Sequence, residues 1–425
     1  MNHEIFFEYG DSLIGQESLK QVIIQLEPEI QRIHQAITHQ NNSPYSFLQL
    51  PFDETLRKKV IQLVEQKKAL QPTALFIIGI GGSNLGTKAI HEALAGIFYN
   101  EINGTLRCYY VDTIEDQYTN QLLTILEKLL QRGDNALLVV VSKSGTTTET
   151  LANAALFIDL LAHYRPQTFS EYLVAITDEE SPLWKSAQES NVSVLSIPRS
   201  VGGRFSVLSA VGLFPLSFLS FNSAALQAGA RRVLENFPHN KYAKMAAEMA
   251  ALIFLHYQAG RNILDTFIFG PSLGSLGAWY RQLVGESLGK DNKGMTPTVS
   301  IGSTDLHSVT QLYLGGPADK FTIFITGSYK ESLEIPLTLF SKNLGQLPLA
   351  RLQQAILQGV QQAYKKREHP FVAFDLGMLT EETLGTFLSM RMLEIVYVGF
   401  LLKVNPFDQP EVELYKEQTR KVLAS

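Results

Sequence analysis

The sequence predicts an α/β protein built from two doubly wound, parallel-sheet domains. Short runs rich in Val, Ile and Tyr alternate with segments of helical periodicity, which is typical of strands joined by crossover helices. The runs are continuously apolar rather than alternating, as expected for strands that are covered on both faces. The chain has 425 residues, which is more than one domain of about 100–200 residues usually holds.

The predicted strands fall into two series. The first series lies at 74–80, 107–113, 136–142, 172–177 and 192–197. A long helical stretch follows it over 206–256. The second series lies at 265–270, 297–301, 322–326 and 372–375, and helices are predicted at 273–288 and 381–402. Two similar series in one chain indicate two sheets of the same kind.

Residues 1–50 are predicted to form a helical extension that precedes the first domain. Apolar residues recur at helical spacing over 18–38, and Pro28 is expected to divide this segment into two helices. We therefore expect a first domain over 51–222 and a second domain over 223–425 that ends in a C-terminal helix.

The composition excludes several classes of protein. The chain carries 36 Lys and Arg against 41 Asp and Glu, a net charge of −5, and has no basic run, so nucleic-acid binding is not expected. The nine histidines lack metal-ligand spacing, so no metal site is predicted. The single cysteine, Cys108, cannot form an internal disulfide, which favours the reducing cytoplasm and a buried thiol. The uncharged segment 205–221 is interrupted by Pro215 and is expected to be buried core rather than a membrane span.

A glycine-rich turn, GIGGSNLGTK (79–88), follows the first predicted strand. Free backbone N–H groups and the helix dipole at such a turn form an anion site. The turn departs from two known motifs. Asn84 stands where a dinucleotide-binding turn has its third glycine, and Thr87-Lys88 reverses the order of a nucleotide phosphate loop. A plain tight turn remains an alternative, and Asp112 stands where a dinucleotide site would place its ribose-binding acid.

The turn after the third predicted strand is richer in groups that bind ligands. Its sequence, SKSGTTTE (142–149), places five hydroxyls and Lys143 at a strand-to-helix junction. Hydroxyls and free N–H groups at a helix start can bind a phosphate monoester without a metal. The alternative is that Thr146 forms a capping box with Glu149, but a cap accounts for one hydroxyl and not for five. We therefore predict a phosphate-binding loop.

Several polar side chains stand in surroundings that suggest chemistry. Arg204 follows two glycines and precedes a long apolar segment, where it could hold a developing oxyanion or a structural ion pair. Glu286 lies four residues after Gln282, so the two share a helix face, and Glu286 is either a general base or a solvent-facing carboxylate. His307 follows a predicted strand among small polar residues, and Lys416 lies on the predicted C-terminal helix. On the residues alone, a structural role stays open for each.

Six segments together resemble the phosphoglucose isomerase (glucose-6-phosphate isomerase) family in its compact bacterial form. They span most of the chain and are GIGGSNLG (79–86), SKSGTTTE (142–149), VGGRFSVLSAVGL (201–213), QLVGESLGK (282–290), STDLHS (303–308) and NPFDQPEVELYK (405–416). The resemblance implies two sugar-isomerase (SIS) domains and an enzyme that needs no cofactor or metal. It also implies a homodimer whose active sites use residues of both subunits.

The same resemblance implies a reaction and its residues. The reaction is the reversible isomerisation of glucose 6-phosphate and fructose 6-phosphate through ring opening and a cis-enediolate, in glycolysis and gluconeogenesis. The implied catalytic residues are Glu286 as base, Arg204 beside the enediolate, and His307, from the partner subunit, with Lys416 in ring opening. The implied substrate-binding residues are Gly82, Ser83, Ser142, Lys143, Ser144, Thr146, Thr147, Gln282 and Gln409.

A non-catalytic SIS protein that senses a sugar phosphate is the alternative from another functional class. It would account for the phosphate-binding loop but not for the joint presence of Glu286, His307 and Lys416. A dinucleotide-dependent oxidoreductase is a further alternative, and Asn84 counts against it.

Overall fold

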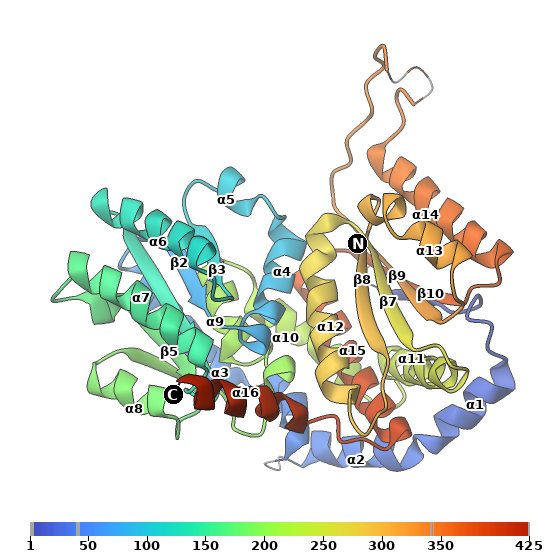
Figure 1. Cartoon of the computed structure of the whole chain (residues 1–425), viewed down its shortest axis with the longest axis horizontal. Coiled ribbons are helices and arrows are strands. Elements are labelled where there is room, and N and C mark those ends of the chain that lie inside the picture. Colours follow the sequence, from blue (N-terminus) through green and yellow to red (C-terminus); the bar gives the residue numbers. More distant parts are fainter. Residues whose placement is uncertain (1–3, 40–42, 341, 343, 424–425) are drawn as a thin grey trace. The chain divides into compact units, whose positions relative to one another are not determined.

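The computed structural model describes residues 4–39, 43–340, 342 and 344–423. The chain divides into two compact units: unit 1 comprises Met1–Arg32 with Arg232–Ser425, and unit 2 comprises Ile33–Arg231. Each unit is built around one five-stranded sheet (Figure 1). The predicted α/β class with two sheets is confirmed. The limits of the units differ from the predicted domain limits because both ends of the chain belong to unit 1.

The sheet of unit 2 is entirely parallel and has the strand order β3-β2-β4-β5-β6. Its strands lie where the first series was predicted: β2 (Pro72–Ile78), β3 (Arg107–Val111), β4 (Asn135–Val141), β5 (Leu173–Thr177) and β6 (Ser193–Ser196). The central strands β2 and β4 are buried along most of their length, as their continuously apolar sequences require. Cys108 is buried in β3, and burial raises the pKa of its thiol to about 12.

Two long helices cover one face of this sheet. They are α6 (Asp116–Gln131) and α7 (Thr148–Tyr164), and a fully buried cluster centred on Phe76, Leu126 and Phe157 joins them to the strands. The remaining helices between residues 44 and 234 are η1 (Pro44–Phe52), α3 (Glu54–Lys68), η2 (Gly81–Ser83), α4 (Leu85–Ala95), α5 (Tyr99–Ile102), η3 (Phe169–Tyr172), α8 (Pro182–Glu189), η4 (Gly203–Phe205), α9 (Ala210–Phe218) and α10 (Ser223–Leu234). Every residue of α9 is buried, which confirms that this apolar segment belongs to the core.

The sheet of unit 1 has the strand order β1-β10-β9-β7-β8. Four parallel strands lie where the second series was predicted: β7 (Ile263–Phe269), β8 (Thr296–Gly302), β9 (Lys320–Ser328) and β10 (Phe371–Met378). The fifth strand, β1 (Phe6–Glu8), pairs antiparallel with β10, and the rings of Phe7 and Phe374 stack with centroids 4.5 Å apart. The expectation that the first 50 residues are helical is therefore wrong at β1. A run of three residues is too short to show a strand period.

Helices cover both faces of the unit 1 sheet (Figure 1). On one face lie α13 (Thr310–Gly315) and α14 (Leu349–Lys366), and on the other lie α12 (Gly274–Leu288) and α15 (Glu381–Leu402). The remaining helices of this unit are α1 (Gln16–Gln25), α2 (Glu27–Thr38, which continues into unit 2), α11 (Lys241–Gln258), η5 (Pro271–Leu273), η6 (Thr304–His307) and α16 (Pro410–Leu423). Pro28 stands in the first turn of α2, where proline is well tolerated, so it divides the N-terminal helical segment as predicted.

Helix α15 is the core helix of unit 1. By length and composition it could cross a membrane, but 94% of its most apolar window is buried inside the protein. It packs against α11 and α12. Two charged side chains, Arg391 and Glu394, lie within it and are fully buried.

Candidate active site

The predicted phosphate-binding loop is a compact turn between β4 and α7. Ser142 Oγ lies 2.9 Å from Thr147 Oγ1, and Ser144 Oγ lies 3.5 Å from the same atom. The backbone N–H and the hydroxyl of Thr146 both donate to Ser144 Oγ, at 3.2 and 3.1 Å. The structure thus gathers four of the five hydroxyls of this segment at the carboxyl end of a central strand.

The start of α7 is open to an acceptor from outside the helix. Its N-cap residue is Thr147, and no side chain caps the first turn in the described structure. The alternative of a capping box at Thr146 is therefore wrong, because the N-cap residue is Thr147 and the Thr146 hydroxyl donates to Ser144 Oγ. Gly145 makes the tight turn possible: its φ is +64°, and a Cβ there would lie 2.8 Å from Ser181. First-turn N–H groups of this kind favour an anion.

Lys143 is half-buried beside this turn. Burial lowers the pKa of its ammonium group, the Asp178 carboxylate opposes that shift, and the cations of Arg199 and Arg204 add to it. Three cationic side chains, Lys143, Arg199 and Arg204, thus lie near the loop together with the Asp178 carboxylate.

The glycine turn after β2 packs directly against the segment that carries Arg204. A Cβ at Gly82 would lie 2.3 Å from the carbonyl carbon of Gly203 and 2.7 Å from the backbone N of Arg204, so glycine is required. Ser206 Oγ also lies 3.3 Å from the Gly82 carbonyl oxygen. Arg204 is only 2% exposed. The backbone of Gly82 therefore lies directly against the segment that carries Arg204.

Asn84 and Asp112, the two residues on which the dinucleotide alternative was judged, both have structural roles. The Asn84 side-chain amide donates to the Gly79 carbonyl at 2.7 Å and closes the turn from inside. The Asp112 carboxylate accepts from the Tyr118 hydroxyl at 3.1 Å and lies 3.5 Å from Lys88 Nζ. Asn84 therefore replaces the third glycine because its side chain completes the turn.

In unit 1, Glu286 and Gln282 lie one turn apart on α12. Gln282 Nε2 donates to Glu286 Oε1 at 2.9 Å, which confirms that the two share a helix face. The other amide atom, Gln282 Oε1, is buried and has no hydrogen-bond partner among the residues that the structure describes. Gly277 lets the helix approach the sheet, since a Cβ there would lie 2.7 Å from Ile268 and Val299. A carboxylate with an adjacent open acceptor can bind and deprotonate a hydroxylated ligand.

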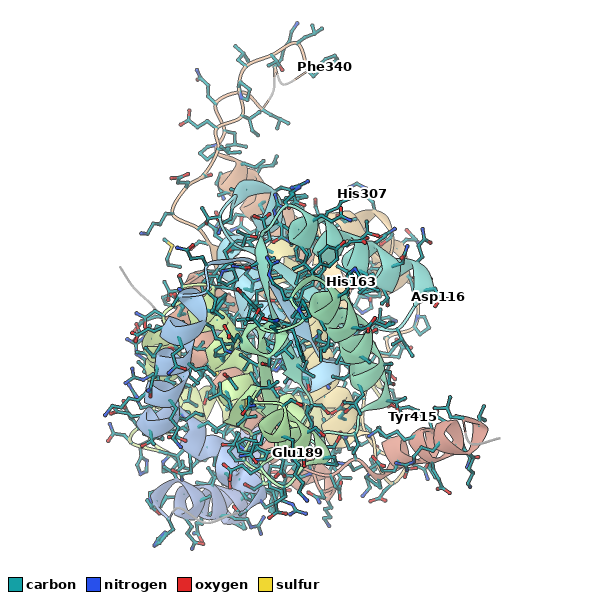
Figure 2. The ribbon with its side chains drawn as sticks, turned by 90° about the vertical axis from the view of Figure 1, so that its left-hand side faces the viewer. Asp116, His163, Glu189, His307, Phe340 and Tyr415 are labelled. Carbon is teal, nitrogen blue, oxygen red and sulfur yellow. The ribbon has the colours of Figure 1, made fainter. Side chains whose placement is uncertain are left out.

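His307 ends η6, directly after β8, and its side chain is exposed (Figure 2). Asp305 holds this loop: its carboxylate accepts from the Ile301 N–H at 2.7 Å and from the Ser308 hydroxyl at 2.8 Å. Asp305 was not identified from the sequence. It lies among small polar residues two positions before His307, and that position is the signal that could have identified it.

Gln409 and Lys416 lie at and beyond the start of α16, of which no described residue is buried. Lys416 Nζ donates to Glu413 at 2.8 Å, within the same helix. Lys290, just after α12, is 8% exposed at its side chain and lies 2.9 Å from the Asp408 carboxylate. This ion pair ties the end of α12 to the loop before α16. Neither Lys290 nor Asp408 was identified from the sequence.

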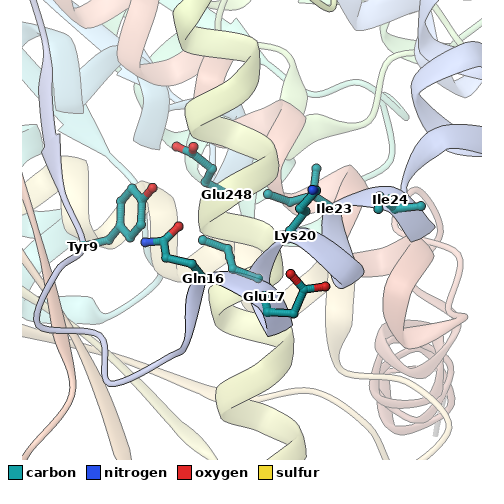
Figure 3. Close-up of a pocket in the computed structure, with 8 residues that line it drawn as sticks. Tyr9, Gln16, Glu17, Lys20, Ile23, Ile24 and Glu248 are labelled. Carbon is teal, nitrogen blue, oxygen red and sulfur yellow. The ribbon is translucent and has the colours of Figure 1, made fainter.

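A surface pocket of unit 1 does not contain any of the predicted site residues. Its volume is about 340 Å³, and the residues that line it are Tyr9, Gln16, Glu17, Leu19, Lys20, Ile23, Ile24 and Glu248 (Figure 3). Burial raises the pKa of Glu248, and Lys244 opposes that shift. Among the described residues, no group of three or more His, Cys, Asp or Glu side chains could hold a metal ion. The predicted site residues of unit 2 lie on its strand-to-helix turns and beside Arg204, and those of unit 1 lie on α12, in η6 and on or just before α16.

Comparisons with known proteins agree with this geometry. Residues 65–310 match the profile of the family described as phosphoglucose isomerase. A probable glucose-6-phosphate isomerase of Methanococcus maripaludis is 32% identical over 426 residues, which cover 98% of this chain and 94% of that relative. A crystallised hypothetical protein of Thermus thermophilus is 28% identical with a TM-score of 0.87, over 99% of this chain and 100% of the other. A glucose-6-phosphate isomerase of Chlamydia trachomatis has the same fold, with a TM-score of 0.82 at 21% identity over 100% and 89% of the two chains.

The matched region contains most of the candidate site. It includes the glycine turn, the phosphate-binding loop, Arg204, the Gln282–Glu286 pair and His307, and it covers more than half of the chain. The relative from Methanococcus maripaludis extends the likeness to 98% of this chain. The chain therefore belongs to the phosphoglucose isomerase family.

Proposed function

We propose that this chain catalyses the reversible isomerisation of glucose 6-phosphate and fructose 6-phosphate. The observation that carries the proposal is the Gln282–Glu286 pair on α12, in a chain that also holds a hydroxyl-rich loop at the start of α7. A protein that only senses a sugar phosphate needs the loop but has no use for an oriented carboxylate. The pair therefore favours catalysis over sensing.

In this proposal the loop between β4 and α7 binds the phosphate group. The dianion accepts hydrogen bonds from the first-turn N–H groups of α7 and from the loop hydroxyls of Ser142, Ser144, Thr146 and Thr147. Lys143 adds a positive charge beside them. Because the phosphate does not react, its binding energy serves to hold C1 and C2 of the sugar in place at the other end.

The chemistry begins with ring opening, in which a proton moves from the 1-hydroxyl to the ring oxygen; His307 and Lys416 carry this transfer. Glu286 then removes the proton from C2 of the open aldose. The C2–H electron pair forms the C1–C2 double bond of a cis-enediolate, and the C1 carbonyl oxygen takes the negative charge. Arg204 stabilises that charge.

The second half of the reaction returns the proton to the neighbouring carbon. Glu286 delivers it to C1, and the hydroxyl proton moves from O2 to O1, which leaves the C2 ketone. One base serves both carbons because they are adjacent. Gln282 orients the carboxylate through its 2.9 Å hydrogen bond, while Gly82, Ser83 and Gln409 contact the sugar.

A coupled assay tests the proposal directly. The purified protein is given fructose 6-phosphate in the presence of a chelator and without nucleotide, and glucose 6-phosphate is measured. We expect its rapid formation. Binding of fructose 6-phosphate without any glucose 6-phosphate would refute the isomerase and support the sensor instead.

We further propose that the chain acts as a cytoplasmic homodimer in which His307 serves the active site of the other subunit. The exposed position of His307 and the low charged fraction of 18% support this arrangement. Inactive Glu286→Gln and His307→Ala proteins, mixed and allowed to exchange subunits, should then recover about a quarter of normal activity, because half of the dimers are hybrids with one intact site. No recovery after proven exchange would place His307 in the site of its own subunit.

A further inference from the structure

A buried charged cluster joins α12 to α15 in unit 1, and no step of the proposed reaction uses it. Arg391 and Glu394 of α15 are both 0% exposed, and Arg391 Nη1 lies 2.5 Å from Glu394 Oε2. Tyr280 of α12 is also buried, and its hydroxyl donates to Glu394 Oε1 at 2.6 Å. Arg391 Cζ stands 4.0 Å from the centroid of the Tyr280 ring. One tyrosine of α12 therefore contacts both members of the ion pair.

Net stability does not explain this cluster. Arg391 Nε and Nη2 are buried and make no hydrogen bond to the described residues. The guanidinium instead lies near the rings of Phe374 and Phe387, at 5.2 and 5.7 Å from their centroids. Buried ion pairs carry a large desolvation penalty, and apolar replacements are often equally or more stable. The best-attested use of such groups is to fix the register of the elements that they join.

The cluster and the catalytic pair lie on opposite faces of α12. With 3.6 residues per turn, Gln282 and Glu286 lie about 200° and 240° around the helix from Tyr280. The face centred on Tyr280 is buried and includes Leu283 and Val284. A rotation or slide of α12 at its contact with α15 would therefore move the Glu286 carboxylate as well.

We propose that Tyr280, Arg391 and Glu394 are positioning residues, which set the rotation and the height of α12 and so place the Glu286 carboxylate against the substrate. This inference rests on the proposed function of Glu286. An apolar interface would let the helix settle in several registers, whereas one hydroxyl, one carboxylate and one stacked guanidinium permit a single register. Because a misplacement of about 1 Å can lower a rate about 100-fold, even a small shift of α12 should be measurable in turnover.

The first test is Tyr280→Phe, which removes the hydroxyl and keeps the ring. Its matched control is Tyr118→Phe in unit 2, which also removes a tyrosine hydroxyl that donates to a carboxylate, at 3.1 Å. At a temperature well below unfolding, we expect kcat of Tyr280→Phe to fall about tenfold with KM within about twofold, on the scale set by misplaced catalytic groups. Tyr118→Phe should keep both constants. A Tyr280→Phe protein with a lower Tm but normal kcat would overturn the proposal, because the hydroxyl would then serve stability alone.

The second test separates position from stability. In the triple variant Tyr280→Phe/Arg391→Met/Glu394→Met the ion pair and the hydroxyl that donates to it are replaced together by apolar groups, so Tm should stay the same or rise, while kcat should still fall about tenfold or more. A stable triple variant with full kcat would overturn the proposal. If this variant does not fold, the kinetics of Tyr280→Phe alone decide whether the proposal holds. An inactive wild-type protein in the same assay would refute the proposed function itself, which is a different outcome.

Discussion

Unit 2 and unit 1 obtain their predicted site residues by different routes. In unit 2 the residues come from two short strand-to-helix turns, 79–86 and 142–147, and from the segment around Arg204 that packs on the first turn. In unit 1 Glu286, His307 and Lys416 come from three separate elements. In unit 2 the backbone of the turns positions these residues, whereas in unit 1 the packing of elements that are distant in the sequence positions them. We therefore expect local changes to affect binding in unit 2 and packing changes to affect chemistry in unit 1.

The largest effect should come from Glu286→Gln, which removes the base but keeps the shape of the side chain. We expect kcat to fall about 10³-fold, within the usual range for loss of a general base. Affinity for fructose 6-phosphate, measured by calorimetry, should stay within about threefold because the phosphate-binding loop is untouched. Unchanged turnover would remove Glu286 from its role and place the base elsewhere.

The second largest effect is expected from a substitution in the phosphate-binding loop of unit 2. Thr147→Val removes a hydroxyl that lies 2.9 Å from Ser142 Oγ and that we assign to the phosphate. Loss of a hydrogen bond to a charged group should raise KM about 10–100-fold with a smaller change in kcat. Thr148→Val, one residue further into α7, is the matched control and should behave like wild type in steady-state kinetics. Equal effects at both positions would argue against a phosphate site defined by particular hydroxyls.

The third effect is expected from a substitution at Gly82, where the glycine turn packs closely against the segment that carries Arg204. In Gly82→Ala the new methyl group would meet the Gly203 carbonyl carbon at 2.3 Å, so the two segments must separate. We expect a loss of about 1–3 kcal/mol in the free energy of unfolding, typical of overpacking, and a lower kcat/KM as Arg204 moves. In the control Gly203→Ala the nearest atom outside the neighbouring residues is 3.9 Å away, so denaturant unfolding should be nearly normal. Similar losses in both variants would contradict a specific contact at Gly82.

The last effect concerns the pH dependence of stability and the buried cluster of unit 1. Burial raises the pKa of Glu394 from 4.5 to about 7, against the opposing effects of Arg391 and the Tyr280 hydrogen bond. Because the folded-state pKa is the higher one, the stability that Glu394 contributes is fully present below about pH 4.5 and is lost as pH rises through about 7. We therefore compare the free energy of unfolding of wild type with that of Glu394→Gln. The value for wild type minus the value for Glu394→Gln should decrease between about pH 5 and pH 8, by about 1 kcal/mol for each pKa unit of the shift. Urea unfolding at both pH values measures this difference, and an equal difference at the two would contradict the raised pKa.

The contrast between the units also explains what could be predicted from the sequence. The two strand-to-helix turns could be located from the sequence because each is a short contiguous segment, 79–88 and 142–149. The spacing of Gln282 and Glu286 was sufficient to place both on one face, as their hydrogen bond confirms. The strands were predictable because a buried parallel strand has no polar face. In each case a short-range pattern carried the information.

Features that depend on distant packing were missed. Arg391 and Glu394 are three apart, a spacing that is common for ion pairs on exposed helices, so nothing local indicates that both are buried. The pairing of Lys290 with Asp408 joins residues more than a hundred positions apart. Thr146 was a plausible cap, yet the hydroxyl of its neighbour Thr147 bonds to Ser142 in the preceding turn. Each outcome was decided by three-dimensional neighbours that spacing does not encode.

The short strand β1 has a consequence for the order in which the protein forms. Residue 7 lies beside residue 374 in the finished sheet, whereas Ile33–Arg231 is one uninterrupted stretch. At about 5–20 residues per second, a ribosome needs roughly 20–70 s to travel from β1 to β10. Unit 2 can fold during that interval, whereas β1 has no partner strand until β10 has been made, and β10 then has an open edge until β1 pairs with it. A strand that precedes unit 2 in the chain is thus incorporated into its sheet only after unit 2 can have folded.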